Sequence, residues 1–143
     1  MRLTRICILS LLPPALMSCT QSPAAQLKTG LQQVASWTAT ARMAGEAWLK
    51  GSVPQAYAAQ TLRAAQETLQ EEAKALEEAL PNSAAAELHA SLLKQARSIA
   101  GVIGQMRAAV EKRDRQTLSH LLKQLEAEQQ ALHALSKRGG AEL

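Results

Sequence analysis

Apolar side chains recur every three or four positions through four stretches of this 143-residue chain. Residues at that spacing lie on one face of an α-helix, so the pattern predicts amphipathic helices with one apolar stripe each. In the third stretch the stripe contains Leu92, Ile99, Ile103 and Met106. Gln, Glu, Lys and Arg occupy most of the positions between, which indicates that the opposite faces are solvated.

Residues that begin or end helices separate the four stretches. Gly51 suits a left-handed helix C-terminus, and Ser52 with Gln55 matches the S-x-x-Q capping box of a following helix. Asp114 is a candidate N-cap for the fourth helix. We expect Gly139-Gly140 to end that helix. The predicted helices span about residues 23–50, 54–80, 83–112 and 115–137.

Four helices of similar length with short connections favour an all-α fold, an antiparallel up-down-up-down four-helix bundle. The composition agrees, since the chain has no Phe, one Tyr and two Trp, and is rich in residues with high helix propensity. Gly101 and Gly104 are expected to let the third helix approach its neighbours closely. The alternative is a three-helix packing with the first helix loosely attached. We predict one domain at residues 23–138 and a flexible tail at 139–143.

A different pattern precedes the first predicted helix. Arg2 and Arg5 are followed by the apolar residues ICILSLL and then by PPALM. This span of roughly 12 apolar residues is too short to cross a bilayer, which needs about 20. A basic start, a short apolar stretch and a small residue are typical of a secretory signal peptide rather than of a membrane-spanning helix.

The end of this segment, Leu16-Met17-Ser18-Cys19, resembles the lipobox of bacterial lipoproteins. The resemblance covers residues 1–19. It implies that the signal peptide, residues 1–18, is cleaved and that Cys19 carries covalent lipid at the start of a tether, residues 19–22. Two or more acyl chains anchor a protein stably to a membrane. The alternative is a plain signal peptide cut elsewhere, which leaves Cys19 as a free thiol.

Thr20 bears on the membrane to which such a lipoprotein is sorted. In lipoproteins of bacteria with two membranes, an aspartate after the cysteine favours retention in the inner membrane. Thr20 stands at that position. The resemblance therefore implies a protein anchored in the outer membrane and facing the periplasm, with the lipid on Cys19 as its only attached group.

The net charge gives little support to a nucleic-acid partner. The whole chain carries 16 Lys and Arg against 12 Asp and Glu, a formal charge of +4. Loss of Arg2 and Arg5 with the signal peptide leaves 14 against 12, or +2. The chain has almost no aromatic side chains for base stacking and no long basic stripe, so we expect no binding to nucleic acid.

Antiparallel topology brings the connections near residues 51–54 and 112–114 to one end of the bundle, away from the tether. We call this the distal end. All three aromatic residues of the chain, Trp37, Trp48 and Tyr57, fall within 21 residues around the first of these connections. Trp48 and Tyr57 are expected to fill the end of the core. The alternative is an exposed aromatic patch that contacts a partner together with nearby cations. The candidate partner-binding residues are Trp48, Lys50, Tyr57, Lys112, Arg113 and Arg115.

Histidines are the weak candidates for a metal site. Pairing of the third and fourth helices would bring His89 and His133 within about two helical turns of each other. The Glu-x-x-His motif of di-iron bundles is absent from the sequence, so histidines on solvated helix faces are the favoured interpretation and no metal is predicted. The sequence also lacks an evident nucleophile with its base, paired acids or a phosphate loop, and we expect no enzymatic activity.

These observations predict a non-enzymatic, lipid-anchored helical bundle that acts as an accessory module and binds a protein of the bacterial envelope. The alternative function is a carrier of a small ligand or metal, with its site inside the bundle. A pocket lined by Trp37, Met43 and Met106 would favour the carrier. A packed core with an exposed distal patch would favour the partner-binding module.

Overall fold

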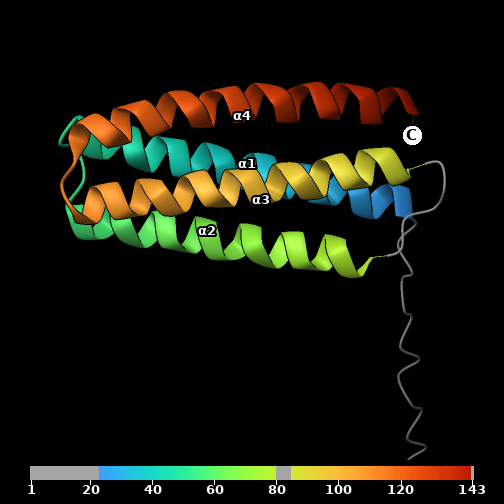
Figure 1. Ribbon diagram of the computed structural model, residues 1–143, viewed down its shortest axis with the longest axis horizontal. Helices are drawn as coiled ribbons and strands as arrows, with labels where there is room; N and C mark the ends of the chain where they lie inside the picture. Colours follow the sequence, from blue (N-terminus) through green and yellow to red (C-terminus); the bar gives the residue numbers. More distant parts are fainter. Residues whose placement is uncertain (1–22, 80–84, 143) are drawn as a thin grey trace, which may run out of the picture.

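The computed structural model describes residues 23–79 and 85–142. Four helices make up nearly all of this part of the chain (Figure 1), namely α1 (Pro23–Leu49), α2 (Gln55–Glu78), α3 (Ala86–Glu111) and α4 (Arg115–Glu142). Each helix packs against its neighbour in sequence, and α1 and α4 also pack together and close the ring. The predicted all-α, antiparallel up-down-up-down four-helix bundle is confirmed.

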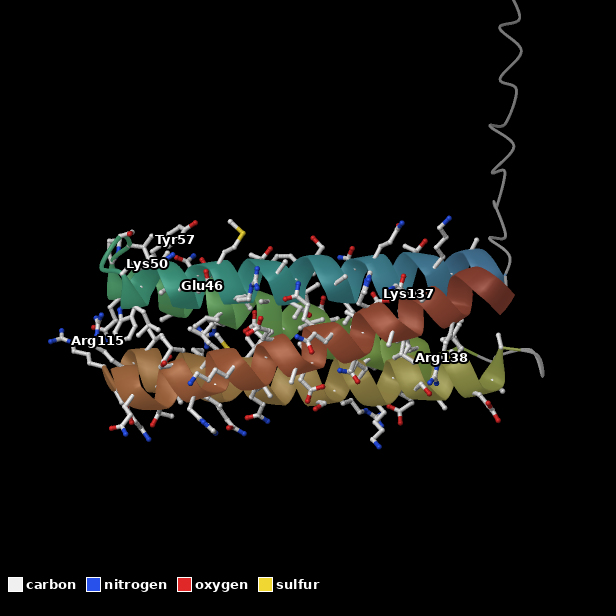
Figure 2. All side chains as sticks on the ribbon, turned by 90° about the horizontal axis from the view of Figure 1, so that it is seen from above. Glu46, Lys50, Tyr57, Arg115, Lys137 and Arg138 are labelled. Atoms are coloured by element: carbon white, nitrogen blue, oxygen red, sulfur yellow. The ribbon has the colours of Figure 1, made fainter. Side chains whose placement is uncertain are left out.

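The two ends of the bundle carry different connections. The α1–α2 and α3–α4 connections lie together at the distal end, whereas α1 begins and α4 ends at the opposite, proximal end (Figure 1). Lys50, Tyr57 and Arg115 lie toward the distal end, and Lys137 and Arg138 toward the proximal end (Figure 2). Because a 26-residue helix such as α3 is roughly 40 Å long, the two ends are separated by about that length.

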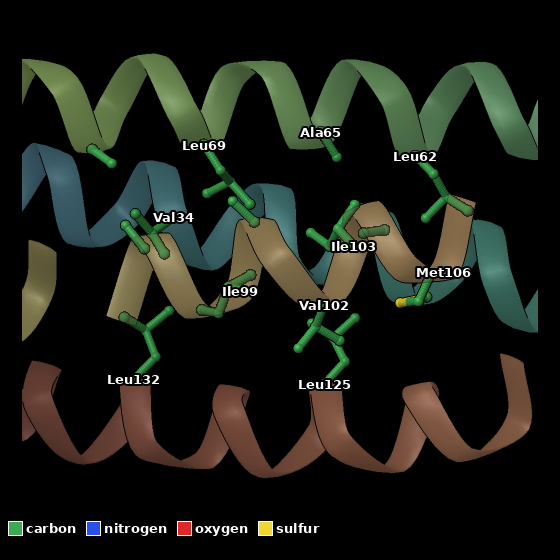
Figure 3. Close-up of a cluster of buried hydrophobic side chains, with 14 of the residues drawn as sticks. Val34, Leu62, Ala65, Leu69, Ile99, Val102, Ile103, Met106, Leu125 and Leu132 are labelled. Carbon is green, nitrogen blue, oxygen red and sulfur yellow. The ribbon is translucent and has the colours of Figure 1, made fainter. Parts of the chain in front are cut away.

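The four apolar stripes meet in one continuous core (Figure 3). Helix α1 is an integral part of it, because Val34, Thr38 and Ala41 are fully buried and α1 also contacts α3 across the bundle. The alternative with a loosely attached first helix is therefore wrong. The largest fully buried apolar side chains of the other helices are Leu62, Leu69, Leu92, Ile99, Ile103, Met106, Leu118 and Leu125.

The α1–α2 connection is built largely as predicted. Gly51 has a left-handed φ of 72°. Its N–H donates to Trp48 O at 2.9 Å, and the Ser52 N–H donates to Ala47 O at 2.9 Å, which together form a Schellman C-terminal motif. The predicted capping box is wrong, because the N-cap of α2 is Pro54, which makes no side-chain capping bond. The Gln55 side chain instead bonds to carbonyls at the end of α3.

The predicted end of the fourth helix is also wrong. Helix α4 continues through Gly139 and Gly140 to Glu142. Gly139 is buried where α4 meets its neighbours, and a Cβ there would lie 2.9 Å from Leu88 Cδ2 and 3.6 Å from Leu31 Cδ1. This glycine therefore allows close packing and does not end the helix.

The two glycines of α3, Gly101 and Gly104, differ in whether a neighbouring helix packs against them. A Cβ on Gly104 would lie 2.7 Å from Gln66 Nε2 of α2, so this glycine leaves room for the end of the Gln66 side chain between the two helices. Gly101 is exposed, and a Cβ added to it would meet no neighbouring atom within 4 Å, so it serves no such contact. The expectation for Gly101 is therefore wrong.

Gly101→Ala is expected to raise the free energy of unfolding by about 0.5–1 kcal/mol, because Ala has less backbone freedom to lose in a helix. Gly104→Ala is the matched control, and we expect it to gain less or to be destabilising, since Gln66 has to move. Urea denaturation followed by circular dichroism measures both. A lower stability of Gly101→Ala than of wild type would contradict the open space seen around Gly101.

Candidate functional site

Trp48 and Tyr57 have different environments at the distal end. Trp48 is 8% exposed and belongs to the core cluster, whereas Tyr57 is 57% exposed. The expectation that both residues fill the end of the core is thus right for Trp48 and wrong for Tyr57. Of the two, only Tyr57 has an exposed aromatic ring.

Arg115 holds the start of α4 against the end of α1. Its guanidinium carbon lies 5.4 Å from the centroid of the Trp48 ring, in a cation–π arrangement. Its Nη2 donates a hydrogen bond to Leu49 O, one of the carbonyls at the α1 C-terminus that lack a helical partner. Arg115 therefore has a structural task, although sequence reasoning placed it among the partner-binding candidates.

Arg113 occupies the same backbone position in the α3–α4 connection as Gly51 in the α1–α2 connection. Its N–H donates to Val110 O at 3.0 Å, and the Asp114 N–H donates to Ala109 O at 2.8 Å, so this is a second Schellman motif. Within the described part of the chain, Arg113 is the one non-glycine residue with a positive φ, which is 57°. That conformation costs an L-residue about 1–2 kcal/mol.

Gln55 connects the two turns of the distal end. Its Nε2 donates to Val110 O at 3.0 Å and to Glu111 O at 2.9 Å, and so satisfies carbonyls at the α3 C-terminus. Its Oε1 accepts a hydrogen bond from Arg113 Nε at 2.9 Å. Sequence reasoning missed this role because Gln55 matched a local capping motif, and no short-range pattern indicates a contact 55 residues away.

Asp114 caps α4 as predicted. Its Oδ1 accepts from the Thr117 N–H at 2.9 Å, and its Oδ2 accepts from Thr117 Oγ1 at 2.7 Å. The side-chain hydrogen bond from Thr117 is the largest cause that holds the pKa of the Asp114 carboxyl below its ordinary value, and the backbone hydrogen bond from Thr117 is the next largest. The carboxylate is therefore favoured in the folded chain.

Asp114→Ala is expected to lower the melting temperature at pH 7, because the α4 N-terminus loses its cap. Since the folded-state pKa is depressed, the stabilisation is fully present above the unfolded pKa of about 3.9 and is lost as the pH falls through the folded pKa. The difference between wild type and Asp114→Ala should therefore shrink between pH 7 and about pH 2 in thermal scans. Asp114→Asn, which keeps an acceptor, should show a weaker pH dependence. A difference from wild type that is equal at both pH values would contradict the account.

The distal end carries an excess of positive charge. Lys50, Lys112, Arg113 and Arg115 are all exposed there, and none forms an ion pair within the described part of the chain. The neighbouring acids are occupied, since Glu46 pairs with Arg42 at 3.7 Å and Glu111 pairs with Arg107 at 3.5 Å. The predicted cationic cluster is thus brought together at one end of the bundle.

A second candidate site, which the sequence did not reveal, is a groove of about 900 Å³ between α1 and α4. Leu31 and Leu132 are its buried apolar lining. Its polar lining includes Lys28, Arg42, Glu126, Gln129, Gln130 and His133. The sequence feature that relates to this groove is the presence of small side chains, such as Ala25 and Ala35, where α1 faces α4. Small side chains are equally compatible with close packing of two helices, so the sequence alone did not indicate a groove.

This groove is not the pocket expected for a carrier. Neither Met43, Met106 nor Trp37 lines it. Met43 is 67% exposed and Met106 is fully buried in the core, while Trp37 packs half-buried against the core cluster. The three side chains whose shared pocket would favour a carrier therefore do not line this groove.

The histidines do not share the groove. His133 is one of its lining residues, but α3, which carries His89, contributes none. His89 is half-buried, and its Nε2 has no hydrogen-bond partner within the described residues. Over residues 23–79 and 85–142, no three His, Cys, Asp or Glu side chains gather in a way that would hold a metal ion.

Cys19, the lipobox and the tether lie outside the described residues. Of the helices that are described, none has an apolar stretch long enough to cross a bilayer. Comparison of the chain with models of protein families, with curated proteins and with solved structures found no match in any of the three.

Proposed function

We propose that this protein is a non-enzymatic lipoprotein of the bacterial envelope that binds a partner protein through its distal end. The observation that carries the proposal is the distal end itself, where exposed Tyr57 lies on the same end of a closed core as Lys50, Lys112 and Arg113. These three cations are exposed and form no ion pair within the described residues.

The anchor is supported by the resemblance of residues 16–19 to a lipobox. Lipid on Cys19 would hold the chain to the membrane close to the proximal end, because only Thr20, Gln21 and Ser22 separate it from Pro23, where α1 begins. The distal end would then project roughly 40 Å from the membrane surface, toward the periplasm if the anchor is in the outer membrane.

Partner binding is supported by the side chains that the distal end exposes. Tyr and Arg are enriched among the residues that contribute most to protein interfaces, because they combine a large contact area with hydrogen-bonding groups. Trp48 and the apolar stripes fill the core behind these exposed side chains. The distal end is therefore a packed surface and not an opening into the bundle. Such a surface suits a macromolecular partner better than a small ligand.

Crosslinking in intact cells tests this function. A photoreactive amino acid replaces Tyr57 in the full chain, and the matched control carries it at Lys137 of the proximal end. We expect one envelope protein to crosslink from position 57 and not from position 137, with identification by mass spectrometry. Absence of any protein crosslink from position 57, or the same products from both positions, would contradict partner binding at the distal end.

The α1–α4 groove favours a second candidate function, a carrier of a small amphiphile. Its volume of about 900 Å³ is in the range of ligand sites, and Leu31 and Leu132 offer an apolar surface beside Lys28 and the glutamine amides. Titration of the full chain with a fluorescent fatty-acid analogue tests this. Saturable binding that is lost in Ala35→Trp would support the carrier, and no saturable binding would exclude that ligand class.

A further inference from the structure

We infer that Arg113 is the anchor for a carboxylate and that the distal end takes an acidic segment of the partner protein. This inference rests on the proposed function and adds the chemistry of the partner. Its starting point is the unusual backbone of Arg113, which has a φ of 57°. Strain of this kind persists where the surrounding structure holds it, and it is often found at functional positions.

The two connections of the distal end provide an internal comparison. Both are Schellman motifs with the same pair of backbone hydrogen bonds, and both place one residue in the left-handed region. Gly51 fills that position in the first connection at no steric cost. The second connection has Arg113, although glycine would serve the backbone better. The turn itself therefore does not require an arginine, and the side chain is what remains to be explained.

The Arg113 side chain is held by one hydrogen bond, and part of its guanidinium has no bonding partner among the described residues. Its Nε donates to Gln55 Oε1 at 2.9 Å, and the Gln55 amide is itself fixed by its bonds to Val110 O and Glu111 O. Its two Nη groups make no hydrogen bond or ion pair with the described residues. A guanidinium fixed through one nitrogen presents its remaining N–H groups in the geometry that binds a carboxylate at two points.

The surrounding charges also favour an acidic partner. Lys50 from the end of α1 and Lys112 beside Arg113 are exposed and unpaired within the described chain. Asp114, the carboxylate of the same turn, accepts hydrogen bonds from Thr117 and keeps its negative charge, which Lys112 also helps to stabilise. An incoming acidic segment still meets three exposed cations that form no ion pair within the described chain, and exposed Tyr57 adds apolar contact area.

An anionic membrane is a poorer fit to the same residues. Electrostatic binding to lipid headgroups uses clusters of about four to eight Lys and Arg. Arg115 is already bonded to Leu49 O and covers Trp48, which leaves Lys50, Lys112 and Arg113. Two lysines beside one positioned guanidinium match a few carboxylates of a protein segment better than a lipid surface.

The test uses the full chain with the photoreactive amino acid at position 57, in intact cells. Arg113→Glu is expected to reduce the yield of the crosslinked partner by at least about tenfold. Arg113→Gly is expected to lose the crosslink too, yet to keep or raise the melting temperature, because glycine relieves the left-handed strain. Lys137→Glu with Arg138→Glu is the control for charge at the other end, and we expect it to leave the yield unchanged.

The crosslinked peptide identifies the partner's chemistry. We expect it to lie in or beside a run of Asp and Glu, and we expect replacement of those acids by Arg to restore the crosslink to Arg113→Glu. A crosslinked protein whose contact segment is neutral or basic would overturn the inference and leave partner binding standing. A crosslink to phospholipid instead of protein would overturn both, as would the absence of any crosslink. A yield that Arg113→Gly leaves unchanged would show that Arg113 does not anchor the partner.

Discussion

Trp48→Ala is expected to lower the free energy of unfolding by about 3–5 kcal/mol, the range measured when large aromatic side chains are removed from cores. Trp48 is 8% exposed and packs in the core cluster at the distal end. Its loss leaves a cavity there and also removes the aromatic surface that Arg115 covers at 5.4 Å. Because α1 and α4 meet at this point, the effect should reach the global unfolding transition.

Tyr57→Ala is the matched control for the Trp48 variant. Tyr57 is 57% exposed, and surface substitutions usually change stability by no more than about 0.5 kcal/mol. Urea denaturation of the full chain, followed by circular dichroism, measures both variants. If Trp48→Ala unfolds at the same urea concentration as wild type, Trp48 is not a core residue and belongs to the exposed patch instead.

Cys19→Ala is expected to abolish both acylation and membrane attachment. A lipobox without its cysteine offers no acceptor for lipid, and two or more acyl chains are what make such anchoring stable. Labelling of cells with radioactive palmitate should mark the wild-type chain and leave Cys19→Ala unmarked. The variant should also leave the membrane fraction when the cells are broken and centrifuged.

Cys7→Ala is the matched control, since Cys7 lies inside the segment that resembles a signal peptide. We expect this variant to incorporate palmitate as wild type does. If wild type incorporates none, or if Cys19→Ala incorporates as much as wild type, the chain is not a lipoprotein. The plain signal peptide would then be the better interpretation of residues 1–19.

The bundle could be predicted because its main determinants are local in sequence. The apolar stripes follow from the 3.6-residue period of the helix, and Gly51 and Asp114 act within a few residues of their own positions. Helix number, helix direction and the placement of Trp48 in the core therefore follow from short-range patterns. The same reasoning located the cations of the distal end.

The features that could not be predicted depend on contacts between distant residues. Gly139 is a helix-ending residue by its local pattern, but Leu88 and Leu31 close in on it and the helix continues. Gln55 fits a capping box, yet its amide bonds to the end of α3. Arg113 gives no sequence signal for a left-handed backbone, since that conformation is typical of glycine or asparagine.

The central claim is that lipid on Cys19 holds the proximal end at the membrane and leaves the distal end free for a partner. Fluorescence resonance energy transfer from a donor label on the full, lipidated chain to an acceptor dye in the bilayer tests this claim directly. We expect strong transfer from a label at Lys137→Cys and weak transfer from Lys112→Cys, because the two ends lie roughly 40 Å apart. Equal transfer from the two positions, or stronger transfer from position 112, would contradict the account.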